Sequence, residues 1–120
     1  MIRPEKGAQM MPILKQTTMN KTEAAYAEEL RLMELSGEVR AFIFEPLRLV
    51  LAHNTKGGRN ATTYTPDFLV VYDDCFEFVE VKGFWRDDAK VKIKVAAELF
   101  PWFRFRAVRY VNKRWVDESF

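Results

Sequence analysis

The chain of 120 residues has room for one domain with a hydrophobic core, but not for two. Its composition, 48% apolar and 30% charged, is ordinary for a soluble globular protein, and no apolar run is long enough to predict a membrane span. A single cysteine, Cys75, excludes an internal disulfide, and a single histidine, His53, argues against a Cys/His zinc site. We expect a cytoplasmic protein, because the N-terminal segment lacks the apolar stretch of a signal peptide.

The net charge of +2 is distributed unevenly along the chain. Residues 1–81 carry nine Lys and Arg against twelve Asp and Glu, whereas residues 82–120 carry ten against five. The basic C-terminal part favours a polyanionic partner such as nucleic acid, and a solvated basic face is the simpler alternative.

Residues 1–19 show no clear periodicity and contain two prolines and a glycine. We predict that they form a flexible N-terminal arm. Residues 20–120 then form a single domain.

A helix is predicted over residues 21–36. Asn20 and Glu23 have the spacing of a capping box, and Gly37 is suited to the position after the last turn. Its apolar stripe consists of Ala24, Ala27, Leu30 and Met33, flanked by Tyr26 and Leu35.

Strand patterns follow the helix. Residues 39–45 and 47–52 alternate like strands, and Pro46 between them indicates a sheet edge or a bulge. Residues 53–60 form a polar loop with a Gly-Gly turn, and residues 61–64 begin the next strand.

The stretch from Thr65 to Gly83 predicts two strands joined by a tight turn at Asp73 and Asp74. Asp67 lies at the start of the first strand, and Glu80 and Lys82 lie at the end of the second. Because strand side chains alternate, Glu80 and Lys82 point to one face while Val81 points away. An acid and a base therefore lie side by side, with a second acid near the neighbouring strand.

A second helix is predicted from Asp87 or Asp88 to about Phe100, where Pro101 ends it. Its apolar positions are Val91, Val95 and Leu99, supported by Ala96. Residues 103–108 then alternate like a strand, and residues 111–116 form a short last strand or a turn. The order α-β-β-β-β-α-β predicts an α/β protein with a central mixed sheet flanked by two helices.

The charged residues of the hairpin suit phosphodiester hydrolysis. The carboxylates of Asp67 and Glu80 are hard oxygen ligands for Mg²⁺ or Mn²⁺, and the backbone carbonyl of Val81 would add a neutral oxygen. Lys82 would contact the scissile phosphate or orient the attacking water. The alternatives are that Asp67 is a turn residue, and that Glu80 and Lys82 form an exposed charge pair. The strongly apolar strand favours the first interpretation, because buried charges without partners are costly.

Pro66-Asp67, followed after twelve intervening residues by Glu80-Val81-Lys82, resembles the PD-(D/E)XK nuclease superfamily. The pattern is similar to that of small phage nucleases of the Holliday-junction-resolvase and endonuclease-I type, over roughly residues 20–110. The resemblance implies a restriction-endonuclease-like α-β-β-β-α-β core and a metal-dependent endodeoxyribonuclease that leaves a 5′-phosphate. It also implies that Glu23 joins Asp67, Glu80 and Val81 at the metal, although capping alone would explain Glu23.

The expected partner is DNA, branched or duplex, in phage recombination or DNA processing, with no small-molecule cofactor. Cleavage of both strands of a junction would need two sites, so we expect a homodimer. Candidate DNA contacts are basic residues of the second helix, the strand of residues 103–108 and the polar loop: Lys90, Lys94, Arg104, Arg106, Lys56 and Arg59. Two alternatives stay open, namely a non-catalytic DNA-binding or assembly module, and a nuclease with a restriction, transposition or exonuclease role.

Overall fold

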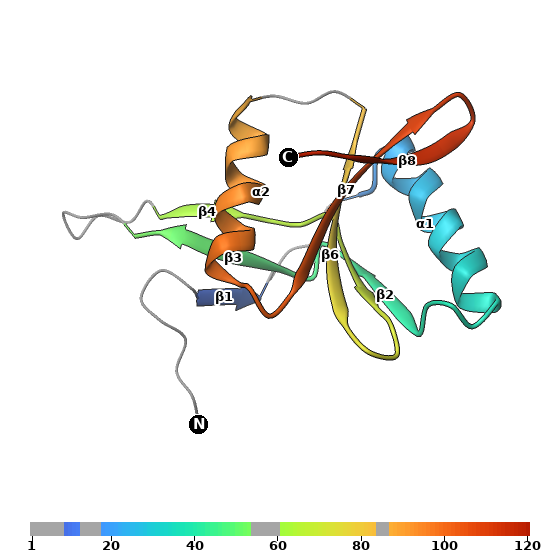
Figure 1. The fold of residues 1–120 in the computed structure, drawn as a ribbon, viewed down its shortest axis with the longest axis horizontal. Coiled ribbons are helices and arrows are strands. Elements are labelled where there is room, and N and C mark those ends of the chain that lie inside the picture. The colour runs from blue at the N-terminus through green and yellow to red at the C-terminus, as the bar shows by residue number, and fades with distance from the viewer. Residues whose placement is uncertain (1–8, 13–17, 54–60, 84–86) are drawn as a thin grey trace.

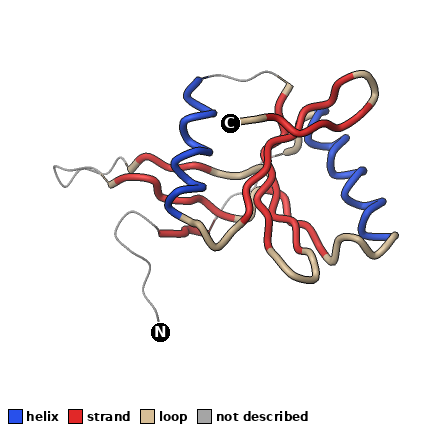
Figure 2. The backbone as a smooth tube through the Cα atoms, in the orientation of Figure 1, coloured by secondary structure: helices blue, strands red, loops and turns tan. Residues whose placement is uncertain are grey.

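The computed structural model describes residues 9–12, 18–53, 61–83 and 87–120. The described chain has two helices and eight strands in two sheets (Figures 1 and 2). The larger sheet has the strand order β2-β5-β6-β7-β8, with a single parallel pair between β6 and β7, and the smaller one has the order β1-β3-β4. The predicted α/β class with a mixed sheet and two helices is confirmed, whereas the second sheet was not predicted.

Helix α1 (Lys21–Leu35) begins and ends as its sequence predicts. The side chain of Asn20 accepts a hydrogen bond from the Glu23 amide at 2.8 Å, and the Asn20 amide donates to Glu23 Oε1 at 2.9 Å. Gly37 follows the last turn with a φ of 86°, a conformation that glycine adopts without strain. The buried stripe differs in part from the prediction: Tyr26 lies fully inside, whereas Ala24 and Leu35 are exposed.

Strands β2 (Ala41–Phe44) and β3 (Leu47–Ala52) belong to different sheets. The chain passes from one sheet to the other at Glu45, whose φ of 44° bends the backbone, and at Pro46. The sequence indicated a sheet edge or a bulge at Pro46, because proline has no amide hydrogen to donate to a neighbouring strand. In the structure, Pro46 lies where the chain leaves one sheet and enters the other.

The hairpin β5 (Phe68–Val71) and β6 (Phe76–Lys82) forms the middle of the larger sheet. Its turn is the predicted one, closed by the Tyr72 amide donating to the Cys75 carbonyl at 2.9 Å. Helix α2 (Asp87–Leu99) then carries the chain to the parallel strand β7 (Arg104–Val111). The chain ends in β8 (Arg114–Glu118), an antiparallel partner of β7, so the predicted last element is a strand.

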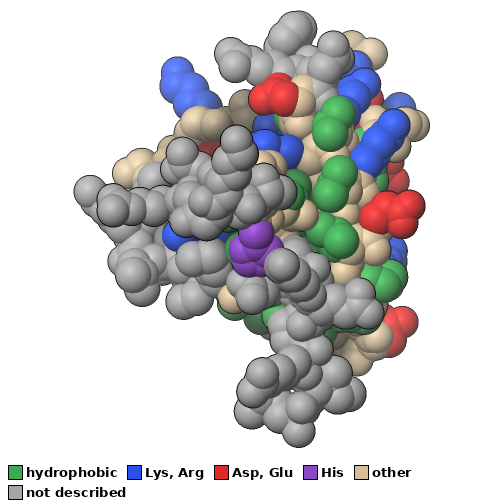
Figure 3. Space-filling view, turned by 90° about the vertical axis from the view of Figure 1, so that its left-hand side faces the viewer, with side chains coloured by type: hydrophobic (Ala, Val, Ile, Leu, Met, Phe, Trp, Pro, Cys, Tyr) green, Lys and Arg blue, Asp and Glu red, His purple; other side chains and the backbone are tan. Residues whose placement is uncertain are grey.

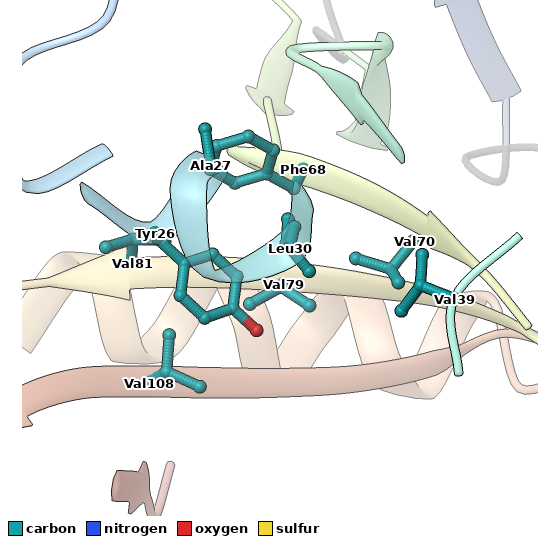
Figure 4. Packing of buried hydrophobic residues seen from close by; sticks show 9 residues of the cluster. All are labelled: Tyr26, Ala27, Leu30, Val39, Phe68, Val70, Val79, Val81 and Val108. Carbon is teal, nitrogen blue, oxygen red and sulfur yellow. The ribbon is translucent and has the colours of Figure 1, made fainter. Parts of the chain in front are cut away.

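Helix α1 covers one face of the larger sheet. Its buried residues Tyr26, Ala27 and Leu30 pack on inward side chains of β5, β6 and β7 (Figure 4). The strand residues of this cluster are Phe68, Val70, Val79, Val81 and Val108. Burial of this apolar surface is the main force that holds α1 on the sheet.

Helix α2 covers the opposite face together with the smaller sheet (Figure 1). The buried residues here include Ile93, Ala96 and Phe100 of α2 and Tyr64 of β4 (Thr62–Tyr64). The predicted stripe of α2 is therefore wrong for Val91, which is 58% exposed, and for Val95, which is 36% exposed. The helix has apolar residues on several sides, so the spacing of one set could not identify the buried side. Neither described helix is long and apolar enough to cross a membrane.

The segment Gln9–Pro12 forms strand β1, which pairs antiparallel with β3. It lies within residues 1–19, which we predicted to be a flexible arm without strands; residues 1–8 and 13–17 of that arm lie outside the described residues. A strand of four residues has little pattern of its own, and this one is defined by pairing with residues about forty positions away.

A matched pair of substitutions tests the orientation of α2. Ile93→Ala should lower the free energy of unfolding by about 2–5 kcal/mol, because it empties a fully buried position. Val91→Ala should change it by less than about 0.5 kcal/mol, because that side chain is exposed. Urea unfolding followed by circular dichroism measures both values, and equal losses would show that the two faces are assigned wrongly.

Candidate active site

The hairpin brings Asp67 and Glu80 to the same end of the sheet. Phe68 of β5 pairs with Val79 of β6, and one further step in this antiparallel register makes Asp67 level with Glu80. The ladder stops there, and Asp67 Oδ2 instead accepts a hydrogen bond from the Val81 amide at 2.8 Å. The position of the Asp67 carboxylate is thus fixed by the backbone of the neighbouring strand.

Glu80 is buried, with 6% of its surface exposed, and both of its carboxylate oxygens have partners. Tyr64 of β4 donates its hydroxyl hydrogen to Oε1 at 2.8 Å, and Lys82 Nζ lies 2.7 Å from Oε2. The predicted side-by-side acid and base are confirmed as an ion pair. This ion pair is half-buried, whereas an exposed surface pair would contribute little to the stability of the fold.

Burial and the negative charge of Glu80 raise the pKa of Asp67 to about 8, against a smaller opposing effect of the Val81 hydrogen bond. The charge of Glu23 adds to the rise. Two carboxylates repel each other strongly where they are poorly solvated, and binding of a cation or a proton reduces this repulsion.

Lys82 remains charged in this setting. Burial lowers the pKa of its ammonium, but the negative charges of Glu80, Asp67 and Glu23 outweigh that effect, and the pKa lies above its ordinary value. The group is therefore a hydrogen-bond donor and a fixed positive charge at neutral pH, and does not accept a proton.

Glu23 lies on the first turn of α1, near enough for its charge to act on both Asp67 and Lys82. Its carboxylate is engaged in the capping box with Asn20. The position of Glu23 is thus compatible both with capping of α1 and with binding of a metal. The observed contact is the cap, and membership of a metal site stays a prediction.

The donor atoms at this end of the hairpin fit a hard cation in their chemistry. Asp67 and Glu80 offer carboxylate oxygens, the ligand type that Mg²⁺ and Mn²⁺ prefer, and their mutual repulsion favours a shared cation. Among the described residues, no three or more His, Cys, Asp or Glu side chains are grouped closely enough to hold a metal. The pair of Asp67 and Glu80 is therefore the part of the predicted ligand set that the fold brings together.

A hollow of about 340 Å³ opens beside this pair, between β4 and α2. Glu80 and Lys82 line it from β6, and Asp88 and Lys92 line it from α2. Thr63, Tyr64, Thr65 and Ala89 complete its wall. Glu80 and Lys82 are thus accessible from the α2 side of the sheet, whereas Asp67 does not line this hollow.

The predicted DNA contacts Arg104 and Arg106 are paired within the protein. Both lie near Glu77, a fully buried carboxylate on the α1 side of β6, with Arg104 Nη2 at 3.3 Å and Arg106 Nε at 3.5 Å. Arg106 also donates to the Tyr26 hydroxyl at 2.8 Å. Their alternation opposite Phe105 is as predicted. Arg106 has a structural role under α1, whereas the side chain of Arg104 is 63% exposed, and DNA contact by either stays a prediction.

The other predicted DNA contacts differ in position. Lys94 is exposed on α2, and Lys90 is half-buried on the same helix. Lys56 and Arg59 lie outside the described residues. Contact of these four side chains with DNA stays a prediction.

Sequence reasoning missed Tyr64, Lys92 and Asp88 as residues of the site. Tyr64 ends a three-residue strand that has no motif, and its contact with Glu80 spans sixteen residues. Lys92 lies between Lys90 and Lys94 in the sequence. Which of these lysines lines the hollow depends on which side of α2 is buried, and that side was predicted in part wrongly. The i, i+4 spacing of Asp88 and Lys92 was the one available signal.

The raised pKa of Asp67 predicts a pH-dependent stability. Between the ordinary value of 3.8 and about 8, the folded protein retains a proton that the unfolded chain releases. The free energy of unfolding should therefore fall as the pH rises through this window, and Asp67→Asn should remove this component. Urea unfolding in the presence of a chelator at pH 5 and pH 8 measures it. Asp74→Asn, at an exposed carboxylate of the hairpin turn, is the control and should behave like the wild type; an equal pH dependence in Asp67→Asn would contradict the prediction.

Comparison with known proteins places the chain in a family. A family model described as "Protein of unknown function (DUF1064)" matches residues 6–118, a stretch that contains every helix and strand of the described structure. No curated protein and no solved structure matches the chain. Because the match covers nearly the whole sequence, the protein belongs to the family described as Protein of unknown function (DUF1064).

Proposed function

We propose that this protein is a metal-dependent endodeoxyribonuclease of the PD-(D/E)XK kind, with a restriction-endonuclease-like core. Asp67 and Glu80, together with the Val81 carbonyl and Glu23, would hold Mg²⁺ or Mn²⁺. The proposed substrate is branched or duplex DNA in phage recombination or DNA processing, cut to leave a 5′-phosphate. A cytoplasmic homodimer would present the two sites that a junction requires.

One observation carries the proposal. Asp67, Glu80 and Lys82 converge at the end of the β5–β6 hairpin, where Asp67 is held by the Val81 amide and Lys82 by Glu80. Glu80 and Lys82 of this group line an accessible hollow, so an extended substrate can reach them. A purely structural ion pair would explain Glu80 and Lys82, but not why a second, strongly repelled carboxylate is held next to them.

A bound cation would supply charge neutralisation at the phosphate and a more acidic water. The role of the chain is to position the reacting groups. Lys82 keeps its proton, so its ammonium would donate to a phosphate oxygen or to the attacking water and stabilise the negative charge of the transition state. Tyr64 holds Glu80 Oε1 and so restricts the rotation of that carboxylate.

A second function is a DNA-binding or assembly module that does not cleave. It is favoured by the contacts of Glu80, whose two oxygens are held by Tyr64 and Lys82. It is also favoured by the lack, within the described chain, of a third carboxylate grouped with Asp67 and Glu80. Turnover in the presence of Mg²⁺ or Mn²⁺ distinguishes the two functions.

The nuclease proposal is tested by cleavage of labelled four-way junctions, flaps, linear duplex and single strands with Mg²⁺ or Mn²⁺. Wild-type protein should cut at least one of these substrates. Asp67→Ala, Glu80→Ala and Lys82→Ala should each lower the rate by at least about 100-fold, because each removes a preorganised charge from the reacting group. The same panel separates a junction nuclease from an exonuclease or a duplex-cutting enzyme.

Asp74→Ala is the matched control, because its carboxylate is exposed in the turn at the far end of the same hairpin. It should retain full activity, and the circular dichroism of all variants should match that of the wild type. Undiminished cleavage by an Asp67→Ala/Glu80→Ala double variant would refute the assignment of the site.

A further inference from the structure

We propose that the hollow between β4 and α2 is a subsite for the DNA phosphate adjacent to the scissile one, with Lys92 as its cation. This inference rests on the proposed function, and it specifies the path of the substrate. The cut strand would run over the α2 side of the larger sheet, and the α1 side would take no part in binding.

Lys82 and Lys92 line the same hollow from different elements, β6 and α2. The Lys82 ammonium is the proposed contact of the scissile phosphate, and Lys92 adds a second lysine to the lining of the hollow. Two cations held by separate, packed elements match a backbone that carries one negative charge per nucleotide. The hydroxyls of Thr63 and Thr65 in the same wall can donate to phosphate oxygens.

Lys92 differs from Lys94, two positions along α2. It is half-buried beside the fully buried Ile93, whereas Lys94 is exposed. Within the described ranges, no carboxylate forms an ion pair with Lys92, although Asp88 lies one turn earlier at the exposed rim of the hollow. A partly desolvated ammonium without an acidic partner favours an anionic ligand.

On the α1 side of the sheet, the two arginines that were predicted to contact DNA are already paired. Arg104 and Arg106 share the buried carboxylate of Glu77, and Arg106 is further held by the Tyr26 hydroxyl and by Asp117 at 3.8 Å. These guanidinium groups already have anionic or polar partners, so a phosphate would have to displace them. Figure 3 views the α2 side, where basic, acidic and hydrophobic side chains lie next to one another.

Lys92→Gln and Lys94→Gln form a matched pair, since both remove one charge from the same helix. Binding of fluorescein-labelled 30-nucleotide single-stranded and duplex DNA is measured by anisotropy in EDTA at several salt concentrations. Lys92→Gln should weaken binding about tenfold and lower the slope of log K against log salt by about one, as expected for one lost phosphate contact. Lys94→Gln should change the affinity by less than about twofold.

Three further measurements separate contact from structural support. Lys92→Arg should restore binding, Asp88→Asn should strengthen it by removing a like charge near the phosphate, and the unfolding midpoint of Lys92→Gln should equal that of the wild type. With Mg²⁺, Lys92→Gln should raise KM with little change in kcat, whereas Lys82→Ala should lower kcat.

The outcomes distinguish this inference from the proposed function. If wild-type protein cleaves DNA and Lys92→Gln keeps the wild-type affinity, salt slope and KM, the subsite is refuted and the nuclease stands. If Lys92→Gln weakens DNA binding but no variant or wild-type protein cleaves, Lys92 is a DNA-phosphate contact of a protein that binds without cutting, and the nuclease is refuted. Absence of both DNA binding and DNA cleavage by the wild type would overturn both proposals, and an Asp88→Asn variant that binds more weakly would contradict the subsite.

Discussion

The hydrogen bond from the Val81 amide to Asp67 Oδ2 is the contact on which the candidate site depends. It forms where the backbone pairing of β5 with β6 ends, so the side chain of Asp67 accepts the next hydrogen bond in place of a backbone carbonyl. As a result, the Asp67 carboxylate is held level with Glu80 although the two repel each other, and the pKa of Asp67 is raised to about 8. A protein gains nothing in stability from such repulsion, so the arrangement points to a function that uses paired carboxylates.

The two faces of the larger sheet have different tasks. On the α1 side, a buried apolar cluster and the Glu77 carboxylate with its two arginines hold the helix in place. On the α2 side, the hollow gives access to Glu80 and Lys82. Because alternation along β6 sends Glu77 and Glu80 to opposite faces, one strand supplies both the structural and the candidate catalytic acid. The sidedness restricts where a substrate can lie.

Local patterns were predicted well and long-range partners were not. The capping box of α1, the hairpin turn and the side-by-side placement of Glu80 and Lys82 depend on residues a few positions apart, and all three are confirmed. The buried side of α2, strand β1 and the contact of Tyr64 with Glu80 depend on packing between distant segments. Charge alone indicated Arg106 as a DNA contact, but its partner Glu77 could be identified only once β6 and β7 were seen side by side.

The central claim is that Asp67 and Glu80 share a catalytic cation, and a crystal structure grown with Mn²⁺ tests it most directly. Anomalous diffraction would locate the ion independently of any activity assay. We expect an anomalous peak for an ion that is bound by Asp67, Glu80 and the Val81 carbonyl, with Lys82 Nζ turned from Glu80 toward the hollow. A structure at saturating Mn²⁺ with no peak at this place, and with Lys82 still paired to Glu80, would contradict it.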